Sequence, residues 1–346
     1  MATGIGMRQR LALLLLLMVS LGLALLGLEG VYRFQLIDMY RPELVTYNPA
    51  SLLTHDNRPK LLVMGDSFTA SRTSYAGLLQ ETLREWRVVN AGVSGTGVLQ
   101  ALYMAPRRFA RFRPALFLYQ VYVGNDLFDL RYPLNWRTIN PLRNLYWFFA
   151  NHFRVVGYVN YRLRHLKETY WTRQAQGITR PGVAWAASTA PGFTVEQYDA
   201  RVKTYLRAEP ALVEDSVRVQ GRRQQDYALL LASLTRLLAH CAPKVCQAYV
   251  LVIPHIGQVD EAFLTPMRQL GAHVTAPETL RLLDYPFLVG MREHFAAWSH
   301  VRVLNPLAML RAQHTQHAVY FAHDEHLNAA GQQALATWVK QQLALQ

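Results

Sequence analysis

The sequence predicts an α/β protein: a three-layer sandwich with a parallel sheet between two layers of helices. Two observations lead to this class. Short apolar runs alternate with segments whose apolar residues recur three or four positions apart, as in helices. Each of the first four runs is followed by a loop that contains Gly or Pro. Strands that alternate with helices need crossover connections, which make neighbouring strands parallel. Sites on such sheets lie at the carboxyl ends of the strands, so reactive side chains are expected there.

The predicted strands are the short apolar runs, in chain order residues 60–64, 87–90, 115–123, 248–253 and 301–304. The predicted helices show the 3.6-residue period, in chain order residues 74–86, 97–109, 227–238 and 328–345. Gly65 ends the first strand and Pro254 ends the fourth. The strand-and-helix segment is predicted to be one domain over residues 59–346.

A signal anchor is predicted at residues 1–30. Leu11–Leu28 is Leu-rich, uncharged and 18 residues long, which gives a helix of about 27 Å against a hydrocarbon core of about 30 Å. A cleaved signal peptide would have an apolar stretch of roughly 7–15 residues, followed by small residues. Here the small residues Gly22 and Ala24 lie inside the run. A core helix at the surface of a soluble domain keeps a polar face towards water, which this run lacks. We therefore expect an uncleaved anchor, with the short tail in the cytoplasm and the other domain periplasmic or at the cell surface.

Residues 31–58 show no sustained periodicity and contain Pro42 and Pro49, which predicts a linker. A long insertion is predicted at about residues 127–215. Its first half interleaves aromatic with basic residues: Trp136, Tyr146, Trp147, Phe148, Phe149, Phe153, Tyr158, Tyr161, Tyr170 and Trp171 with Arg137, Arg143, Arg154, Arg162, Arg164 and Lys167. This composition suits a cap over the site, an interfacial segment at lipid headgroups, or a helical subdomain that buries its aromatic side chains.

The charge and the cysteines exclude some classes of protein. The formal net charge of +13 favours anionic surfaces such as phospholipid headgroups or acidic glycans. No helix-turn-helix, zinc-finger or RNP-like pattern is present, so no nucleic-acid partner is expected. Cys241 and Cys246 lack the second pair that a metal framework needs, and we predict no metal and no cofactor. The two cysteines either form a bridge in an oxidising compartment, with Cα atoms about 4.4–6.8 Å apart, or are two small apolar side chains.

Polar groups follow the first three strands. Ser67, in Gly-Asp-Ser-Phe, lies at a strand-to-helix turn, where helix N–H groups can bind an oxyanion. The second strand leads into Asn-Ala-Gly-Val-Ser-Gly-Thr-Gly at residues 90–97, whose glycines suit a close backbone approach to a ligand, a tight turn or a phosphate-binding loop. Asn125, in Gly-Asn-Asp, follows the third strand, and His-Asp-Glu-His-Leu-Asn at residues 323–328 precedes the last helix.

These four blocks resemble those of the SGNH hydrolases, also called GDSL-like lipases and esterases, which are named for Ser, Gly, Asn and His. The blocks occur in the family's order over residues 60–331. The resemblance implies a flavodoxin-like sheet, with Ser67 as nucleophile and His326 as the base that takes and returns its proton. It implies an oxyanion hole made by the backbone N–H groups of Ser67 and Gly95 and the side-chain amide of Asn125.

The block around the histidine departs from the commonest family pattern. Many members carry Asp three residues before the His, where this chain has His323. Asp324 lies two residues before His326, an arrangement that resembles polysaccharide O-acetyltransferases and membrane-anchored relatives. We predict that Asp324 orients His326, with Glu325 as the alternative.

The loop after the fourth strand is also expected to border the cleft. Its residues His255 and Gln258 are predicted to contact substrate, unless they are ordinary loop residues.

Together these features predict an ester hydrolase or O-acyltransferase that acts at the cell envelope through an acyl-enzyme on Ser67. The expected substrate is an acyl ester or an acylated glycan, and a lipase acting on membrane lipid would differ in substrate alone. In similar systems a multi-pass membrane acyltransferase partner supplies the acyl group. The alternative class is a non-catalytic subunit of a membrane complex that retains the fold for binding or scaffolding.

Overall fold

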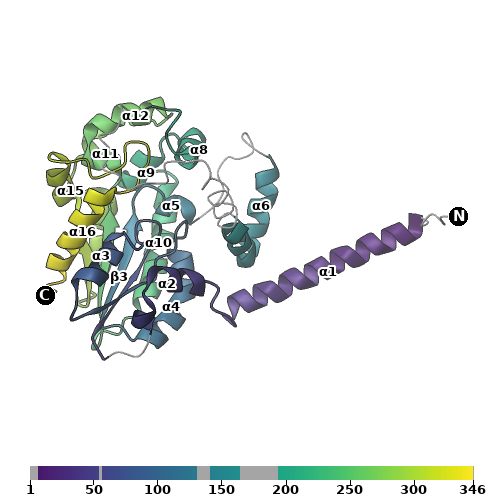
Figure 1. Ribbon diagram of the computed structural model, residues 1–346. Coiled ribbons are helices and arrows are strands. Elements are labelled where there is room, and N and C mark those ends of the chain that lie inside the picture. Colours follow the sequence, from purple (N-terminus) through teal and green to yellow (C-terminus); the bar gives the residue numbers. More distant parts are fainter. Residues whose placement is uncertain (1–6, 54–56, 131–140, 164–193, 346) are drawn as a thin grey trace, which may run out of the picture. The chain divides into compact units, whose positions relative to one another are not determined.

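The computed structural model describes residues 7–53, 57–130, 141–163 and 194–345. The chain divides into two compact units. The smaller unit combines Met1–Met39 with Pro141–Arg180, and the larger unit combines Tyr40–Asn140 with Pro181–Gln346. Figure 1 traces both units along the sequence, and each is described by itself.

The larger unit is built on a five-stranded parallel sheet with the strand order β2-β1-β3-β4-β5. The strands are β1 Lys60–Met64, β2 Arg87–Asn90, β3 Leu116–Tyr122, β4 Gln247–Ile253 and β5 Val301–Leu304. This is the flavodoxin-like order, in which the connection direction reverses between β1 and β3. The predicted α/β class and the five predicted strands are confirmed, because each observed strand begins and ends within one residue of its prediction.

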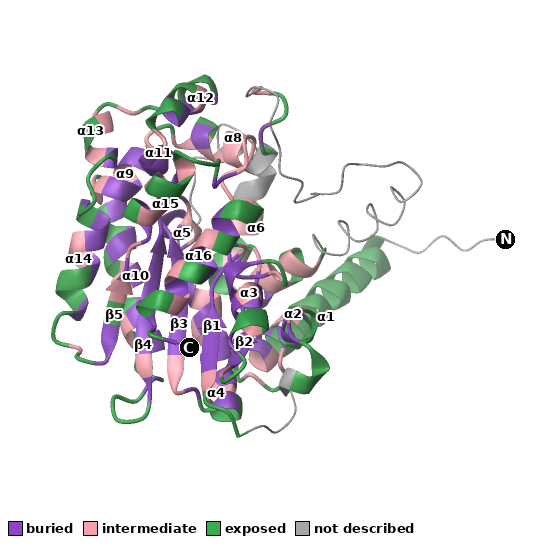
Figure 2. Cartoon of the chain, turned by 60° about the vertical axis from the view of Figure 1, so that its left-hand side comes forward, coloured by how far each residue is buried: buried purple, intermediate pink, exposed green. Residues whose placement is uncertain are grey.

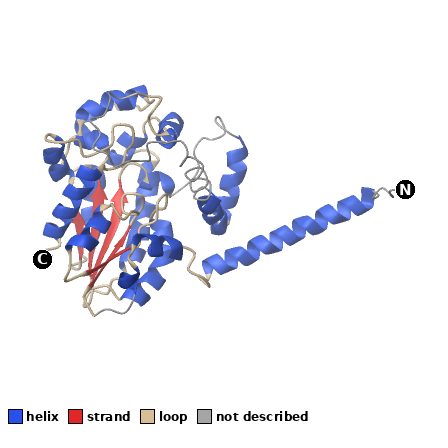
Figure 3. Ribbon diagram, viewed as in Figure 1, coloured by secondary structure: helices blue, strands red, loops and turns tan. Residues whose placement is uncertain are grey.

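Two layers of helices cover the sheet, as Figure 3 shows. One layer packs α3 Tyr75–Thr82 against α16 Ala329–Gln342, and α16 against α15 Leu307–His314. The other packs α10 Arg223–Leu238 against α4 Val98–Phe112 and α14 Pro286–Phe295. Shorter elements join these layers: α2 Arg41–Tyr47, η1 Ala50–Leu53, α5 Asp126–Asp129, α8 Ala200–Ala208, α9 Leu212–Arg218, α11 Ile256–Val259, η4 Glu261–Phe263, α12 Leu264–Gln269 and α13 Pro277–Leu280.

The core lies along the inner strands, which Figure 2 draws as buried. Leu61, Leu62 and Val63 are fully buried, as are Phe117 and Leu118 on the neighbouring strand. A parallel sheet covered on both faces needs apolar side chains on both, so its strands are continuous apolar runs instead of alternating ones. This is why short apolar runs predicted the strands well.

The predicted linker at residues 31–58 differs from the structure. Residues 41–47 form α2 inside the larger unit, where Leu44 is buried. The side chain of Asn48 donates to the carbonyl oxygen of Asn90 (2.7 Å) and accepts from its backbone N–H (2.9 Å). The larger unit therefore begins near residue 40. A helix of seven residues is too short to produce a visible apolar period, so the sequence pattern missed it.

The predicted insertion at residues 127–215 is divided between the two units. Helix α6 (Pro141–His152) and a helix over residues 154–163 belong to the smaller unit, whereas α8 and α9 belong to the larger one. Six of the aromatic and basic residues lie outside the described residues: Trp136, Arg137, Arg164, Lys167, Tyr170 and Trp171.

The smaller unit contains α1, a continuous helix over Met7–Arg33. The expectation that Leu11–Leu28 forms one helix is confirmed. An 18-residue window of α1 has a mean hydropathy of 2.8, and none of it is buried. The helix is long and apolar enough to cross a membrane, and its exposure distinguishes it from a core helix. An anchor and a signal sequence are both compatible with it.

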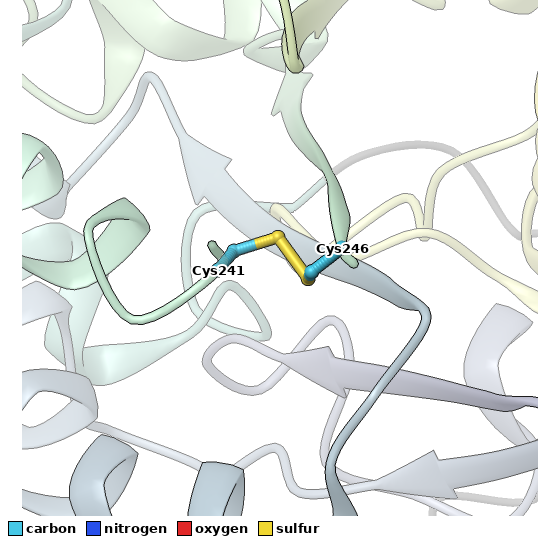
Figure 4. The surroundings of a disulfide bond; sticks show 2 residues. All are labelled: Cys241 and Cys246. Atoms are coloured by element: carbon cyan, nitrogen blue, oxygen red, sulfur yellow. A yellow bond between two sulfur atoms is a disulfide. The ribbon is translucent and has the colours of Figure 1, made fainter. Parts of the chain in front are cut away.

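Cys241 and Cys246 are joined by a disulfide in the loop between α10 and β4 (Figure 4). Their Cα atoms are 5.1 Å apart, within the range expected for a bridge. Both residues are buried. Of the two alternatives that the sequence left open, the structure has the bridge.

Candidate active site

Ser67 occupies the turn between β1 and α3, at the carboxyl edge of the sheet. The turn is held from β3, because Gln120 Oε1 accepts from the backbone N–H of Asp66 (3.1 Å) and from the hydroxyl of Thr69 (3.1 Å). A Cβ atom at Gly65 would lie 2.5 Å from both Gln120 Oε1 and Thr69 Oγ1. Glycine before the Asp-Ser pair is therefore a steric requirement of this turn.

The hydroxyl of Ser67 is hydrogen-bonded to a histidine far away in the sequence. Ser67 Oγ lies 2.6 Å from Nε2 of His326, which is 259 residues further along the chain. Nδ1 of His326 lies 2.5 Å from Oδ1 of Asp324. A carboxylate can only accept, so Nδ1 carries the proton and Nε2 accepts from Ser67 when the ring is neutral. The arrangement can take the hydroxyl proton from Ser67.

The surroundings of His326 favour its charged form. Burial would lower the pKa of the imidazole, but the hydrogen bond and charge of Asp324, with the charges of Asp66 and Glu325, raise it above its ordinary value. The pKa of Asp324 is lowered, because its bonds to His326 outweigh its burial. The ring of Phe68 packs against the imidazole, with centroids 4.9 Å apart. An imidazolium formed during a reaction would thus be stabilised where it arises.

Glu325 faces away from the imidazole. Its Oε2 accepts from the hydroxyl of Tyr122 (3.0 Å), and its Oε1 lies 3.0 Å from Nε2 of His255. Nδ1 of His255 accepts from the backbone N–H of Gly257 (3.0 Å), so Nε2 carries the proton and donates to Glu325. Of the two carboxylates considered as the orienting group, Asp324 is the one in contact with His326.

The predicted substrate contacts of His255 and Gln258 are not supported. His255 has no exposed surface, and Gln258 is only 2% exposed. Both side chains form the cap of α11, in which Gln258 Oε1 accepts from the backbone N–H of His255 (2.9 Å). A polar loop residue at the carboxyl edge can face the cleft or brace the loop, and the sequence does not distinguish these directions. Here both residues brace the loop.

The three predicted oxyanion donors follow the adjacent strands β2, β1 and β3. Adjacent strands lie about 4.8 Å apart, which brings the loops of Gly95, Ser67 and Asn125 side by side. In the described part of the chain, neither the backbone N–H of Ser67 nor that of Gly95 has a hydrogen-bond partner. The side-chain amide of Asn125 likewise has none there. All three donors are available to a ligand.

Gly95 is exposed and has a φ of 71°, in the left-handed region that L side chains rarely adopt. The loop therefore uses its glycine for a backbone turn, and the same turn leaves the N–H group of Gly95 unbonded. Of the alternatives predicted for the loop at residues 90–97, the backbone at Gly95 has the geometry of a tight turn.

The carboxyl groups of Asp66, in the turn, and of Asp126, after β3, are both buried. Burial raises the pKa of Asp66 to about 6, although its hydrogen bond from Phe68 N–H (2.9 Å) and the charge of His326 favour ionisation. Burial and the charge of Asp66 raise the pKa of Asp126 well above its ordinary value. Asp126 Oδ2 accepts from the backbone N–H of Tyr122 (3.0 Å). The carboxyl of Asp126 is therefore neutral at pH values where an ordinary Asp is ionised.

The loop that carries His326 is fixed at both ends. Asn328 caps α16 by accepting from the N–H of Gly331 (3.0 Å), and its amide donates to the carbonyl oxygens of Ala318 (2.6 Å) and Tyr320 (3.1 Å). At the other end, Nε2 of His323 accepts from the backbone N–H of Thr194 (3.1 Å). Thr194, within the predicted insertion, thus contacts the loop that carries His326.

Sequence reasoning missed two residues of this site, Gln120 and Tyr122. Both lie on β3, and a polar residue inside the apolar run Ala-Leu-Phe-Leu-Tyr-Gln-Val-Tyr-Val was the available signal for Gln120. No group of three or more His, Cys, Asp or Glu side chains that could hold a metal ion occurs among the described residues.

A scan against models of protein families finds no match, and a search of curated proteins finds no similar sequence. Solved structures with a similar fold include a catalytic mutant of an acetylxylan esterase from Geobacillus stearothermophilus. It has 12% identity and a TM-score of 0.42, with 85% of this chain and 97% of that chain covered. An α/β hydrolase from the metagenome of Lake Arreo, Spain, has 14% identity and a TM-score of 0.40, with 85% and 98% covered. Likeness at this level does not show the activity of this chain.

Proposed function

We propose that the chain is a serine-dependent ester hydrolase or O-acyltransferase that works through an acyl-enzyme on Ser67. The observation that carries the proposal is the chain of hydrogen bonds from Ser67 Oγ to His326 Nε2 and from His326 Nδ1 to Asp324. A nucleophile, a base and an orienting carboxylate in this order are the parts that acyl transfer needs.

The proposed reaction has two halves. Ser67 Oγ attacks the ester carbonyl carbon while its proton passes to His326 Nε2. The oxygen that becomes negative is stabilised by the N–H groups of Ser67 and Gly95 and the amide of Asn125. The imidazolium then protonates the departing alcohol, which leaves an ester on Ser67. In the second half, water or a sugar hydroxyl gives its proton to Nε2 and attacks that ester. The bond to Ser67 Oγ then breaks, and the imidazolium returns the proton to Oγ.

The proposed place of action is the cell envelope, on the extracytoplasmic side of a membrane crossed by α1. The Cys241–Cys246 bridge supports an oxidising compartment, and the apolar surface of α1 supports the membrane. Acylated glycans are the proposed substrates. A multi-pass membrane acyltransferase is the proposed partner when a sugar hydroxyl is the acceptor.

Hydrolysis of a small p-nitrophenyl ester tests the chemistry. Ser67→Ala and His326→Ala should each lower kcat by several orders of magnitude, and the double variant by little more, because the residues act as a unit. A fluorophosphonate probe should label the wild type and not Ser67→Ala. Near-wild-type turnover in either single variant would contradict the assignment of Ser67 and His326. No turnover and no labelling of the wild type would instead favour the non-catalytic membrane subunit.

A further inference from the structure

The smaller unit fastens two helices of the predicted insertion to the carboxyl end of α1. Glu29 Oε2 accepts from the backbone N–H of Val155 (2.9 Å), so it caps the first turn of the helix over residues 154–163. Arg33 binds Glu29 Oε1 (2.6 Å) and donates to the carbonyl oxygen of His152 (3.1 Å), the last residue of α6. The junction between the two helices is thus bonded to one turn of α1.

A second set of contacts holds the helix over residues 154–163 along its length. The hydroxyl of Tyr158 donates to the carbonyl oxygen of Met39 (2.9 Å), and Arg162 donates to the same oxygen. The rings of Tyr158 and Tyr32 are 6.1 Å apart. The helix over residues 154–163 is therefore held at two points, by Glu29 on α1 and by the carbonyl oxygen of Met39 after α1.

The fastening points lie close to the end of the apolar run. That run ends at Leu28, and Glu29–Arg33 occupies the next five residues of α1. At a rise of about 1.5 Å per residue, these residues extend no more than about 8 Å beyond the hydrocarbon boundary. The headgroup layer on each side of a bilayer is about 5–8 Å thick. If α1 spans a membrane, the bonds that Glu29 and Arg33 make to Val155 and His152 are formed within that layer.

Both helices expose apolar side chains. On α6, Leu145, Phe148 and Phe149 are 59%, 57% and 38% exposed, and their spacing places them on one face. On the other helix, Val159 and Leu163 are exposed one turn apart. Apolar stripes of this kind mark a surface that is covered by a partner or a membrane.

The positive charge of residues 141–163 favours binding to an anionic surface. Residues 141–163 contain three Arg and no Asp or Glu. Arg162 lies over the rings of Tyr158 and Tyr161, 5.1 and 5.3 Å from their centroids. Aromatic rings and Arg side chains are both stable at headgroup depth, where the rings contact acyl chains and the guanidinium groups contact phosphates.

We propose that α6 and the helix over residues 154–163 lie on the bilayer that α1 crosses, with Leu145, Phe148 and Phe149 inserted between anionic phospholipids. Interfacial helices bury their apolar face by about 5–10 Å at the headgroup boundary. The bilayer would cover the exposed stripe, and the bonds from Glu29 and Arg33 would hold the two helices against the anchor. The proposal rests on α1 being a membrane anchor and is independent of the proposed catalysis.

Photolabelling of the full chain in nanodiscs of phosphatidylglycerol and phosphatidylcholine tests the proposal. A phospholipid with a diazirine near the ester end of its acyl chain should label α1 and the peptide that contains residues 145–149. Leu282 and Leu283, about half exposed in the larger unit, provide a control peptide that should remain unlabelled. Label on α1 without label on 145–149 overturns the proposal, and absence of label from α1 overturns the anchor itself.

A matched pair of variants separates lipid contact from general exposure. Phe148→Ser with Phe149→Ser should lower labelling of α6 by roughly fivefold or more and leave labelling of α1 unchanged, because the apolar face no longer inserts. Leu282→Ser with Leu283→Ser should change neither. With a bifunctional protein cross-linker in place of the lipid probe, cross-links from α6 to a second copy of the chain would show a protein interface and contradict the proposal.

Discussion

At the scale of single residues, the two neighbouring carboxylates Asp324 and Glu325 have different hydrogen-bond partners. Asp324 is bonded to the imidazole, whereas Glu325 is bonded to Tyr122 and His255 on the other side of the loop. Burial and the charge of Glu325 raise the pKa of the Tyr122 hydroxyl well above its ordinary value, so it stays protonated and donates. Glu325 makes no hydrogen bond to the imidazole in the described structure, so it acts on His326 through its charge, which raises the pKa of the imidazole. A change in that pKa can be measured separately from the effect of Asp324.

The pH dependence of kcat/KM on its acid side should show the effect of the Glu325 charge. His326 must be neutral to act as a base, and its pKa is raised above 6.5, so kcat/KM should fall as the pH drops through a midpoint above about 6.5. Glu325→Gln removes a negative charge and should move the midpoint to lower pH. Glu81→Gln, at an exposed position on α3, is the control and should leave it in place. An unmoved midpoint in Glu325→Gln would contradict this role.

Asn125 should contribute to the transition state and hardly to substrate binding. Its amide has no partner in the described chain, and such a donor is worth about 10²–10³ in kcat. Asn125→Ala should show that loss in steady-state kinetics, with KM little changed. A change confined to KM would mean that Asn125 binds the ground state.

At the scale of elements, the beginning of α16 fixes the loop that carries His326. The side chain of Asn328 caps that helix and also bonds two carbonyl groups of the preceding segment. The cap and the loop are thus held by one residue, two positions after His326.

Asn328→Ala should therefore lower both stability and activity. Loss of the cap should cost about 0.5–2 kcal/mol of unfolding free energy, measured by urea denaturation. Asn328→Ser keeps a capping oxygen but lacks the amide donors, so it should recover most of the stability and little of the kcat. If Asn328→Ser restored both quantities, the two donated bonds would have no part in positioning His326.

Much of the fold, and part of the candidate site, could be predicted from the sequence. Continuous apolar runs gave the strands, because a doubly covered parallel sheet requires them. The blocks around Ser67 and His326 predicted the neighbourhood of these residues, and their catalytic roles stay predictions. The direction in which His255 and Gln258 point depends on packing that no local pattern contains, and the division of the insertion between two units depends on contacts such as Glu29 with Val155. Neither could be predicted.

At the scale of the whole molecule, α1 is the element that bears on where the chain is located. Its exposed apolar surface is stable in lipid and unfavourable in water. The full chain should remain in the membrane fraction after carbonate washing, with an unprocessed amino terminus on mass spectrometry. A shortened chain in the soluble fraction would identify α1 as a cleaved signal, and a full-length soluble chain would exclude a membrane role for it.

The sequence separation of 259 residues between Ser67 and His326 also affects when the two residues are made. A ribosome adds about 5–20 residues each second, so the histidine is made roughly 13–52 s after the serine. During that interval the serine has no base to take its proton. Under the proposed function, the growing chain is therefore inert towards esters during synthesis, and its reactivity begins only after the segment that carries His326 has been made.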